Sequence, residues 1–153
     1  MSDDLLYATR LNSAYLQSPV DDLFSLYYTM QWAAVFHNRE FATGKDIPVI
    51  LRALRDDISG DQGARSLATH SIVDPPVLDV DDYGEFVANC HPFLQDWYSS
   101  LRALLYEWKK CQSNLKKSNV KKSSSLYTSL FSAFAVQGVA QLAALVYKHT
   151  QSM

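Results

Sequence analysis

The sequence has few of the residues that stabilise small extracellular folds. It contains two cysteines among 153 residues, Cys90 and Cys111, and they do not have CxxC spacing. Two cysteines are too few for a disulfide framework, so we expect the protein to fold in a reducing compartment. A chain of this length can bury a substantial core as one domain without disulfides or bound metal.

The sequence also lacks the common catalytic motifs. It has no P-loop, GxGxxG, HExxH or GxSxG pattern. Cys90 and His91 are adjacent, but neighbouring residues rarely present both side chains to one site, so a core cysteine beside a histidine that starts a helix is the better interpretation. The four histidines lie too far apart in the sequence, with too few cysteines, to suggest a metal centre: His37, His70, His91 and His149. We therefore expect no catalytic residues, no metal and no cofactor.

The N-terminal sequence does not resemble a secretion signal. MSDDLLYATR begins with acidic residues and lacks both a basic start and an apolar run. Residues 1–17 mix apolar and polar types without a clear period. We interpret them as an arm that packs locally.

Four segments carry apolar residues at helical spacing. The first covers residues 18–37, with Ser18 as its N-cap and Pro19 at its first helical position. The others cover about 46–60, 91–108 and 123–149; Asp46 caps the second, Pro92 fits the first turn of the third, and serines 123–125 cap the fourth. The pattern predicts a single all-α domain over residues 1–153, built as a four-helix bundle.

Residues 60–88 predict a long irregular connection between the second and third helices. Gly63, the Pro75-Pro76 pair and Gly84 interrupt any continuous helix, and five acids lie between residues 74 and 85. A connection of this length is usually functional or mobile, or contains short strands. IVDPPVLDV and GEFVA are the candidates for a strand pair.

The fourth predicted helix contains a run of 25 uncharged residues, 123–147. That length would span a bilayer. Gln137 and Gln141 lie one turn apart at its centre, and many other positions are Ala or Ser, so its insertion into a membrane would be marginal. We expect this helix to be buried on most sides within the bundle, and we do not expect a membrane partner.

The most basic stretch is WKKCQSNLKKSNVKKSSS, residues 108–125. It has six lysines within fourteen residues and no acid, and its spacers are mainly Ser, Asn and Gln. We interpret residues 109–125 as a flexible loop between two helix ends. Clustered lysines attract phosphates independently of base sequence; the alternative is a solvated polar linker. The candidate RNA-binding lysines are Lys109, Lys110, Lys116, Lys117, Lys121 and Lys122.

Charge is distributed unevenly along the chain. Residues 1–90 have fourteen acids against six Lys or Arg, whereas residues 91–153 have two acids against eight. Such a chain could neutralise itself, bind a polyanion at one end, or stack its acidic part on the basic part of another copy. Carboxylates that meet across a subunit contact acquire raised pKa values, which makes association depend on pH. The candidates are Asp56, Asp57, Asp96 and Glu107; alternatively, they are solvated residues of helix ends and loops.

Arg39 lies near the turn between the first two predicted helices. An arginine there is ordinarily a surface residue or a cap on the carbonyls of the preceding helix. If the four helices form two antiparallel hairpins, one end of the bundle carries both Arg39 and the lysine stretch. That arrangement predicts a basic end.

Two long segments resemble the coat proteins of rod-shaped plant viruses, the tobacco mosaic virus group. NSAYLQSPVDDLFSLYYTMQWAAVFHNR is similar to that family's aromatic N-terminal segment and proline-initiated first helix, and DDYGEFVANCHPFLQDWYSSLRALLYEW to its third helix. A basic loop and a long Ala-rich last helix follow in the same places, so the resemblance covers nearly the whole chain. It implies a four-helix bundle that stacks into a helical rod around single-stranded RNA.

By the same resemblance, Arg39 matches an RNA-contacting arginine, and Lys109 and Lys110 match basic positions just after the third helix. This chain departs from the family in using Lys rather than Arg in the loop, and in the longer, more acidic connection over 60–85. We expect a capsid protein located in the virion, and in the host cytoplasm during assembly. The alternative is a cytosolic or tail-anchored helical interaction module, and a third, weaker hypothesis is an enzyme with an unrecognised site.

Overall fold

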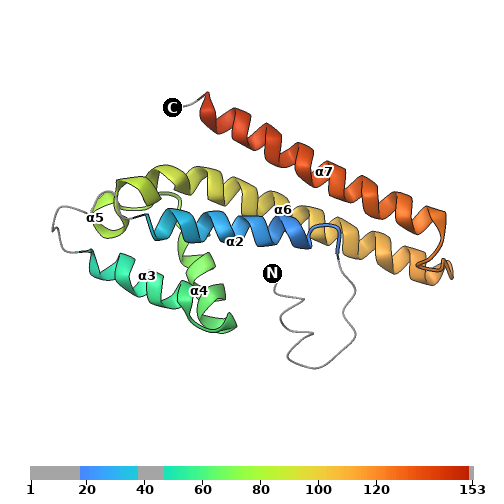
Figure 1. Ribbon diagram of the computed structural model, residues 1–153, viewed down its shortest axis with the longest axis horizontal. Coiled ribbons are helices and arrows are strands. Elements are labelled where there is room, and N and C mark those ends of the chain that lie inside the picture. Colours follow the sequence, from blue (N-terminus) through green and yellow to red (C-terminus); the bar gives the residue numbers. More distant parts are fainter. Residues whose placement is uncertain (1–17, 38–46, 152–153) are drawn as a thin grey trace. The chain divides into compact units, whose positions relative to one another are not determined.

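The computed structural model describes residues 18–37 and 47–151, and these form six helices joined by turns, with no strand among them (Figure 1). The all-α prediction is therefore confirmed. The helices are α2 (Asp21–Val35), α3 (Val49–Ser59), α4 (Gln62–Val73), α5 (Val80–Tyr83), α6 (Glu85–Lys117) and α7 (Ser125–Thr150).

Polar residues cap the helices close to the predicted positions. Ser124 Oγ accepts a hydrogen bond from the Tyr127 N–H at 3.2 Å and begins α7. α2 begins at Asp21 rather than at Pro19, the predicted first helical position; before it, the Ser18 N–H donates to Asp21 Oδ2 at 2.6 Å and the Val20 N–H donates to Ser18 Oγ at 3.2 Å. α3 is followed directly by Gly60. These contacts satisfy amide groups that have no partner inside a helix. The predicted cap at Asp46 lies outside the described residues.

The stretch predicted to be irregular, residues 60–88, is largely helical. Asp61 Oδ1 accepts from the Ala64 N–H at 3.0 Å and caps α4, and Asp79 Oδ1 accepts from the Asp81 N–H at 2.9 Å and caps α5. The prediction of a strand pair is wrong. IVDPPVLDV covers the end of α4, a turn and the first residue of α5, and GEFVA covers Gly84 and the first turn of α6. Asp79, one of the five acids that suggested a loop, is therefore an N-cap.

The long helix α6 begins six residues before the predicted start. Pro92 lies inside it rather than at its first turn, which removes one hydrogen bond to the carbonyl of Ala88. A continuous buried face keeps the helix intact through that position: Val87, Leu94, Trp97, Leu101, Leu104 and Trp108. The helix also extends to Lys117, so the predicted loop over 109–125 is wrong for residues 109–117.

The described residues form two compact units, each considered separately below. The acidic unit comprises residues 27–37 and 47–96, with nine acids against three arginines. The hairpin unit comprises residues 18–26 and 97–151, with three acids against eight Lys or Arg. The charge asymmetry of the sequence thus coincides with the division of the structure.

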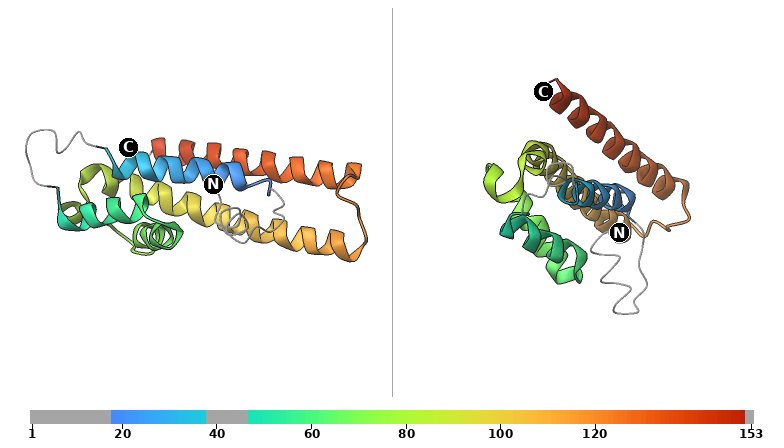
Figure 2. Two further views of the ribbon diagram at one scale, coloured as in Figure 1. Left: turned by 60° about the horizontal axis from the view of Figure 1, so that its bottom comes forward. Right: turned by 60° about the vertical axis from the view of Figure 1, so that its left-hand side comes forward.

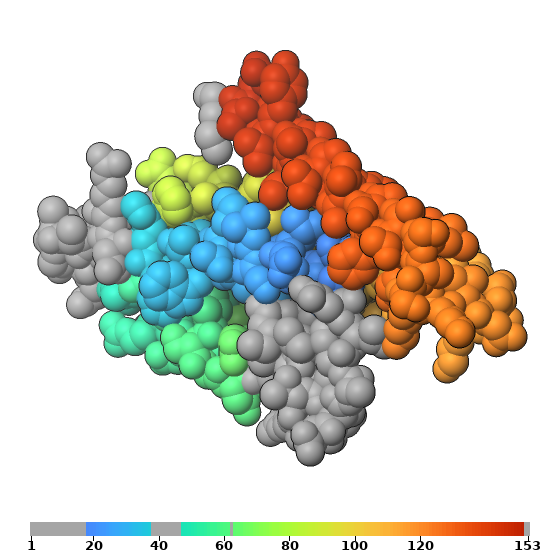
Figure 3. Space-filling model, turned by 45° about the vertical axis from the view of Figure 1, so that its right-hand side comes forward, coloured from blue at the N-terminus to red at the C-terminus, as the bar shows by residue number. Residues whose placement is uncertain are grey.

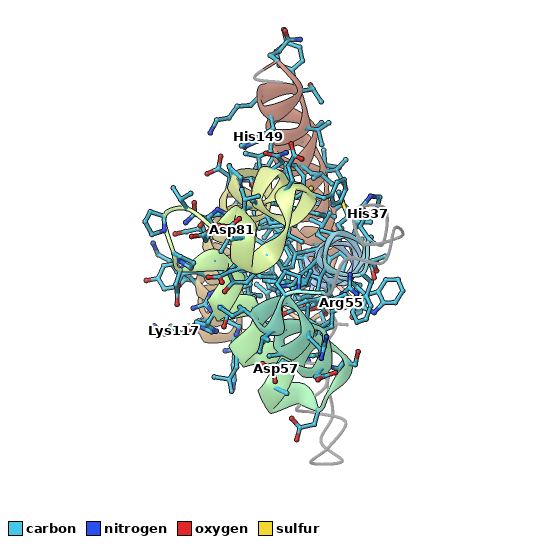
Figure 4. All side chains as sticks on the ribbon, turned by 90° about the vertical axis from the view of Figure 1, so that its left-hand side faces the viewer. His37, Arg55, Asp57, Asp81, Lys117 and His149 are labelled. Carbon is cyan, nitrogen blue, oxygen red and sulfur yellow. The ribbon has the colours of Figure 1, made fainter. Side chains whose placement is uncertain are left out.

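In the acidic unit, Arg55 joins α3 to the end of α2. Its Nε donates to the Val35 carbonyl at 2.8 Å, its Nη2 donates to the His37 carbonyl at 3.3 Å, and its guanidinium lies 5.4 Å from the centre of the Phe36 ring. Figure 4 shows Arg55 on the side of α3 that faces α2. These bonds satisfy carbonyls at the helix end, as a basic C-cap does.

In the hairpin unit, α6 and α7 run antiparallel and are joined by a short turn (Figure 2). Trp108 anchors the first half of α7, because three aromatic rings of α7 contact it edge-on. The ring centres lie 5.7 Å away for Tyr127, 5.8 Å for Phe131 and 5.3 Å for Phe134. Further along α7, Gly138 is buried against Leu23 and Leu104.

Candidate nucleic-acid and assembly surfaces

The turn between α6 and α7 is short and begins with hydrogen bonds to the last carbonyls of α6. The Val120 N–H donates to the Leu115 carbonyl at 3.0 Å, and the Asn119 N–H donates to the Lys116 carbonyl at 3.1 Å. Asn119 has φ of 54°, the left-handed conformation that asparagine tolerates at this position. The pattern is a Schellman motif, which satisfies the last carbonyls of α6. The lysines after residue 117 are therefore carried on a defined turn.

All six candidate lysines are exposed, four on the last turns of α6 and two on the turn. Lys110 Nζ lies 3.9 Å from Glu107 Oε2, an exposed pair that contributes little to stability. Within the described ranges, no carboxylate pairs with Lys116, Lys117, Lys121 or Lys122. Lys117 is labelled at the end of α6 in Figure 4. The charges of Lys116, Lys117, Lys121 and Lys122 are therefore available to an external anion.

A shallow groove of about 480 Å³ lies among the last turns of α6, the turn and the first turn of α7. Three of the lysines line it, together with polar side chains of α6 and the ring of Tyr127. The lining residues are Lys109, Gln112, Ser113, Leu115, Lys116, Val120, Lys122 and Tyr127. The prediction that Arg39 joins these lysines concerns a residue outside the described ranges.

The surface of α7 differs from the prediction that this helix would be buried on most sides. Of its 26 residues only Tyr127 and Gly138 are buried. Figure 3 shows its atoms forming an open ridge along the face turned to the viewer. Several large apolar side chains are exposed along it: Leu126, Val136, Val139, Val146 and Tyr147.

α7 is also apolar enough to cross a membrane. Its most apolar 18-residue window has a mean hydropathy of 1.6 and is 6% buried, and no other helix in residues 18–37 and 47–151 meets the same criteria. A helix that is apolar on all sides is normally covered by protein or by lipid. Among the described residues, only Tyr127 and Gly138 of α7 are buried, so most of this helix is without such cover there.

The four candidate carboxylates are distributed over two helices. Asp56 and Asp57 are adjacent on α3, where Asp56 is exposed and Asp57 half-buried, whereas Asp96 and Glu107 lie on α6. Glu107 has Lys110 as its neighbour, so its charge is partly compensated within the chain. Asp56 and Asp57 are neighbours only in sequence, and as consecutive residues of a helix their side chains point in different directions.

Cys90 is half-buried and His91 is buried, and both lie inside α6. Burial raises the pKa of the Cys90 thiol, which disfavours the nucleophilic thiolate. His91 is buried, and burial lowers its pKa, although the backbone carbonyls of Ile72 and Pro75 act in the opposite direction. Among residues 18–37 and 47–151, no group of three His, Cys, Asp or Glu side chains could hold a metal ion.

A partly exposed aromatic pair lies at the end of α2. Trp32 is 53% exposed and stacks on Phe36, with 4.8 Å between ring centres. Helical spacing of Trp32 and Phe36 was visible in the sequence, but the spacing alone did not indicate exposure.

No protein-family model, curated protein or solved structure matches the chain.

Proposed function

We propose that this protein is a structural capsid protein that assembles with copies of itself into a helical rod and packages single-stranded RNA. In the assembled subunit, α2, α3, α6 and α7 form the four-helix bundle that the sequence predicts. The carrying observation is the α6–α7 hairpin, in which an apolar, exposed helix begins at a turn rich in unpaired lysines. One surface suits other subunits, and the other suits a polyanion.

The exposed length of α7 supports self-assembly. A free subunit leaves large apolar side chains of this helix in water, and each buried Å² of such surface contributes about 25 cal/mol. Contiguous apolar surface of this kind usually marks an interaction site. A contact between unlike surfaces of two copies repeats without closing, so it generates a filament.

The lysine turn supports RNA binding without base recognition. A coat that packages a genome must accept any sequence, and phosphate contacts provide this because they carry no base information. The hairpin unit has eight Lys or Arg against three acids, and the excess lies mainly on the last turns of α6 and the following turn. Each phosphate neutralised on a single strand should steepen the dependence of log K on log salt by about 0.7.

The test combines assembly with binding. Purified protein is mixed with two unrelated single-stranded RNAs and examined by negative-stain microscopy, nuclease protection and salt-titrated binding. We expect rods or discs, protected RNA, and equal affinity for the two sequences. A variant in which Lys116, Lys117, Lys121 and Lys122 are all alanine should bind both RNAs more weakly with a flatter salt slope. An unchanged slope would mean that these lysines are solvated spacers.

A second candidate function, a tail-anchored interaction module, is favoured by the hydropathy of α7. Lys148 and His149 follow its apolar segment, and Lys121 and Lys122 precede it, as basic residues flank membrane helices. Against this, Gln137 and Gln141 would face lipid near the centre of the span. Expression without detergent separates the two functions: a coat protein stays in the soluble or particle fraction, and recovery only in carbonate-resistant membranes would favour the module.

A further inference from the structure

The lysines of the hairpin unit are not equivalent in position. Lys109, Lys116 and Lys122 line the groove of about 480 Å³ together with Gln112, Ser113 and Tyr127. Lys110, Lys117 and Lys121 are also exposed but do not line it. Three of the six lysines between residues 109 and 122 therefore line one concavity. Its volume falls within the range of about 300–1,000 Å³ typical of small-ligand sites.

Tyr127 also lines this groove. The residue is 9% exposed, and its hydroxyl is buried and forms no hydrogen bond among the described residues. The ring is held by Trp108 at 5.7 Å, so it is fixed in place. An unsatisfied buried hydroxyl costs about 1–3 kcal/mol, and a ligand that accepts its hydrogen bond would recover part of that cost.

The backbone around the groove is compatible with an anion. The carboxyl end of a helix carries partial negative charge, which would repel phosphate. Here the carbonyls of Leu115 and Lys116 already accept hydrogen bonds from Val120 and Asn119. The amino end of α7, with its partial positive charge, meets the same turn at Ser124. The lysine charges are therefore not opposed by unpaired carbonyls of the Schellman turn.

We infer that this groove is a seat for one phosphate group, bound by Lys109, Lys116 and Lys122 and by a hydrogen bond from the Tyr127 hydroxyl. The hydroxyl is buried in the free protein, so the side chains around it must shift for the anion to reach it. The inference rests on the proposed function in one respect, that the phosphate belongs to single-stranded RNA. Lys110, Lys117 and Lys121 then contribute only long-range attraction.

Two variants with equal charge test the position of the lysines. One carries Lys109→Gln, Lys116→Gln and Lys122→Gln, and the other carries Lys110→Gln, Lys117→Gln and Lys121→Gln. Both lose three charges and keep residues with good helix propensity. Affinity for a short single-stranded RNA is measured by fluorescence anisotropy at fixed salt. We expect the groove variant to bind about tenfold more weakly than the other variant, the scale of one charge-assisted hydrogen bond. Equal weakening would overturn the inference.

Tyr127→Phe tests the hydroxyl without changing charge or ring packing, and Tyr106→Phe, at an exposed position of α6, is its matched control. We expect Tyr127→Phe to weaken RNA binding about three- to tenfold with an unchanged salt slope, because no charge is lost. Wild-type affinity in Tyr127→Phe would overturn the role of the hydroxyl. Melting temperatures verify that both variants are folded.

The source of the phosphate is tested separately, so that this inference and the proposed function can fail independently. Inorganic phosphate and vesicles containing phosphatidylserine are titrated against wild type and the two triple variants. If wild type binds phosphate but no RNA, and only the groove variant loses phosphate binding, the seat is supported and the RNA function is overturned. In the opposite outcome, wild type binds RNA, and the two triple variants have equal affinity for RNA, for inorganic phosphate and for vesicles. That outcome overturns the phosphate seat and leaves the RNA function intact.

Discussion

α3 and α7 differ in how many of their residues are buried. α3 has 11 residues and buries three of them, Leu51, Leu54 and Ile58, within the acidic unit, whereas α7 has 26 residues and buries two. The apolar residues of α3 form one stripe, which a single neighbouring surface can cover. Those of α7 surround the helix, so one contact with α6 and the start of α2 leaves most of them exposed. A helix that is apolar on all sides therefore predicts that protein or lipid covers it, but it does not predict that the rest of the same subunit provides the cover.

The largest predicted effect comes from removing the anchor of α7. Trp108→Ala deletes the ring against which Tyr127, Phe131 and Phe134 pack, and should lower the free energy of unfolding by about 3–5 kcal/mol. Chemical denaturation measures the loss. Hydrogen exchange should rise in α7 and change little in α3 and α4, because Trp108 belongs to the hairpin unit.

Trp32→Ala is the control for this prediction, because Trp32 is 53% exposed. Its loss should be much smaller than that of Trp108→Ala. Equal destabilisation by the two substitutions would show that α7 does not depend on its contact with α6. The contrast between a self-contained α3 and an α7 held mainly through Trp108 would then be wrong.

A smaller effect is expected at the second buried position of α7. A methyl group at residue 138 would contact Leu23 and come within 2.9 Å of Leu104 Cδ2, so Gly138→Ala requires these two buried side chains or α7 itself to shift. Overpacking of this kind costs about 1–3 kcal/mol, which exceeds the gain in helix propensity. Gln137→Ala, at the exposed neighbouring position, should not destabilise the protein. A stabilised Gly138→Ala variant would mean that α7 packs only through its first turns.

Much of the fold was predictable because its helices carry local signals. Ser124 before α7 and Gly60 after α3 mark helix ends, and apolar spacing marked α2, α3 and α7. α4 was missed because Gly63 and the Pro75-Pro76 pair suggested an irregular connection, although Asp61 is the N-cap of a helix that runs to Val73. α6 was predicted too short, because Pro92 suggested its start and the Ser/Asn spacers of the lysine stretch suggested its end. Tertiary packing and the helix propensity of lysine outweigh these local signals.

The candidate site was predictable in composition but not in geometry. The six lysines were evident from the sequence, whereas the groove formed by Lys109, Lys116 and Lys122 depends on where α6 ends and how the turn folds. The partner of Glu107, Lys110, follows from helical spacing of three residues. The exposure of α7 was not predictable, because apolar residues around a helix are equally consistent with a buried core.

In the acidic unit, stability should depend on pH through His91. Burial lowers the pKa of His91 in the folded protein below its ordinary value of 6.5, so the unfolded chain binds a proton more readily. Neutral His91 makes its full contribution to the free energy of unfolding above about pH 6.5. This contribution is lost as the pH falls below that value, by at most about 1.4 kcal/mol per pH unit. Denaturation at pH 7.5 and 5.5 should show less dependence on pH in His91→Gln. His70→Gln, at an exposed position of α4, is the control, and an unchanged dependence in His91→Gln would contradict the prediction.

The smallest effect on stability, with the largest expected effect on assembly, concerns the carboxylates of α3. Asp56→Asn and Asp57→Asn should change the free energy of unfolding by no more than about 0.5 kcal/mol, as surface substitutions usually do. If copies bring these carboxylates together, lowering the pH to about 5 protonates them, relieves repulsion and lengthens the polymers without RNA, and the amides should give longer polymers at neutral pH. Glu107→Gln should have less effect, because Lys110 already compensates Glu107 at 3.9 Å.

Sedimentation velocity between pH 5 and 7.5 measures polymer length. Profiles that change with neither pH nor the aspartate substitutions would eliminate the carboxylate hypothesis and leave the apolar surface of α7 as the basis of self-assembly.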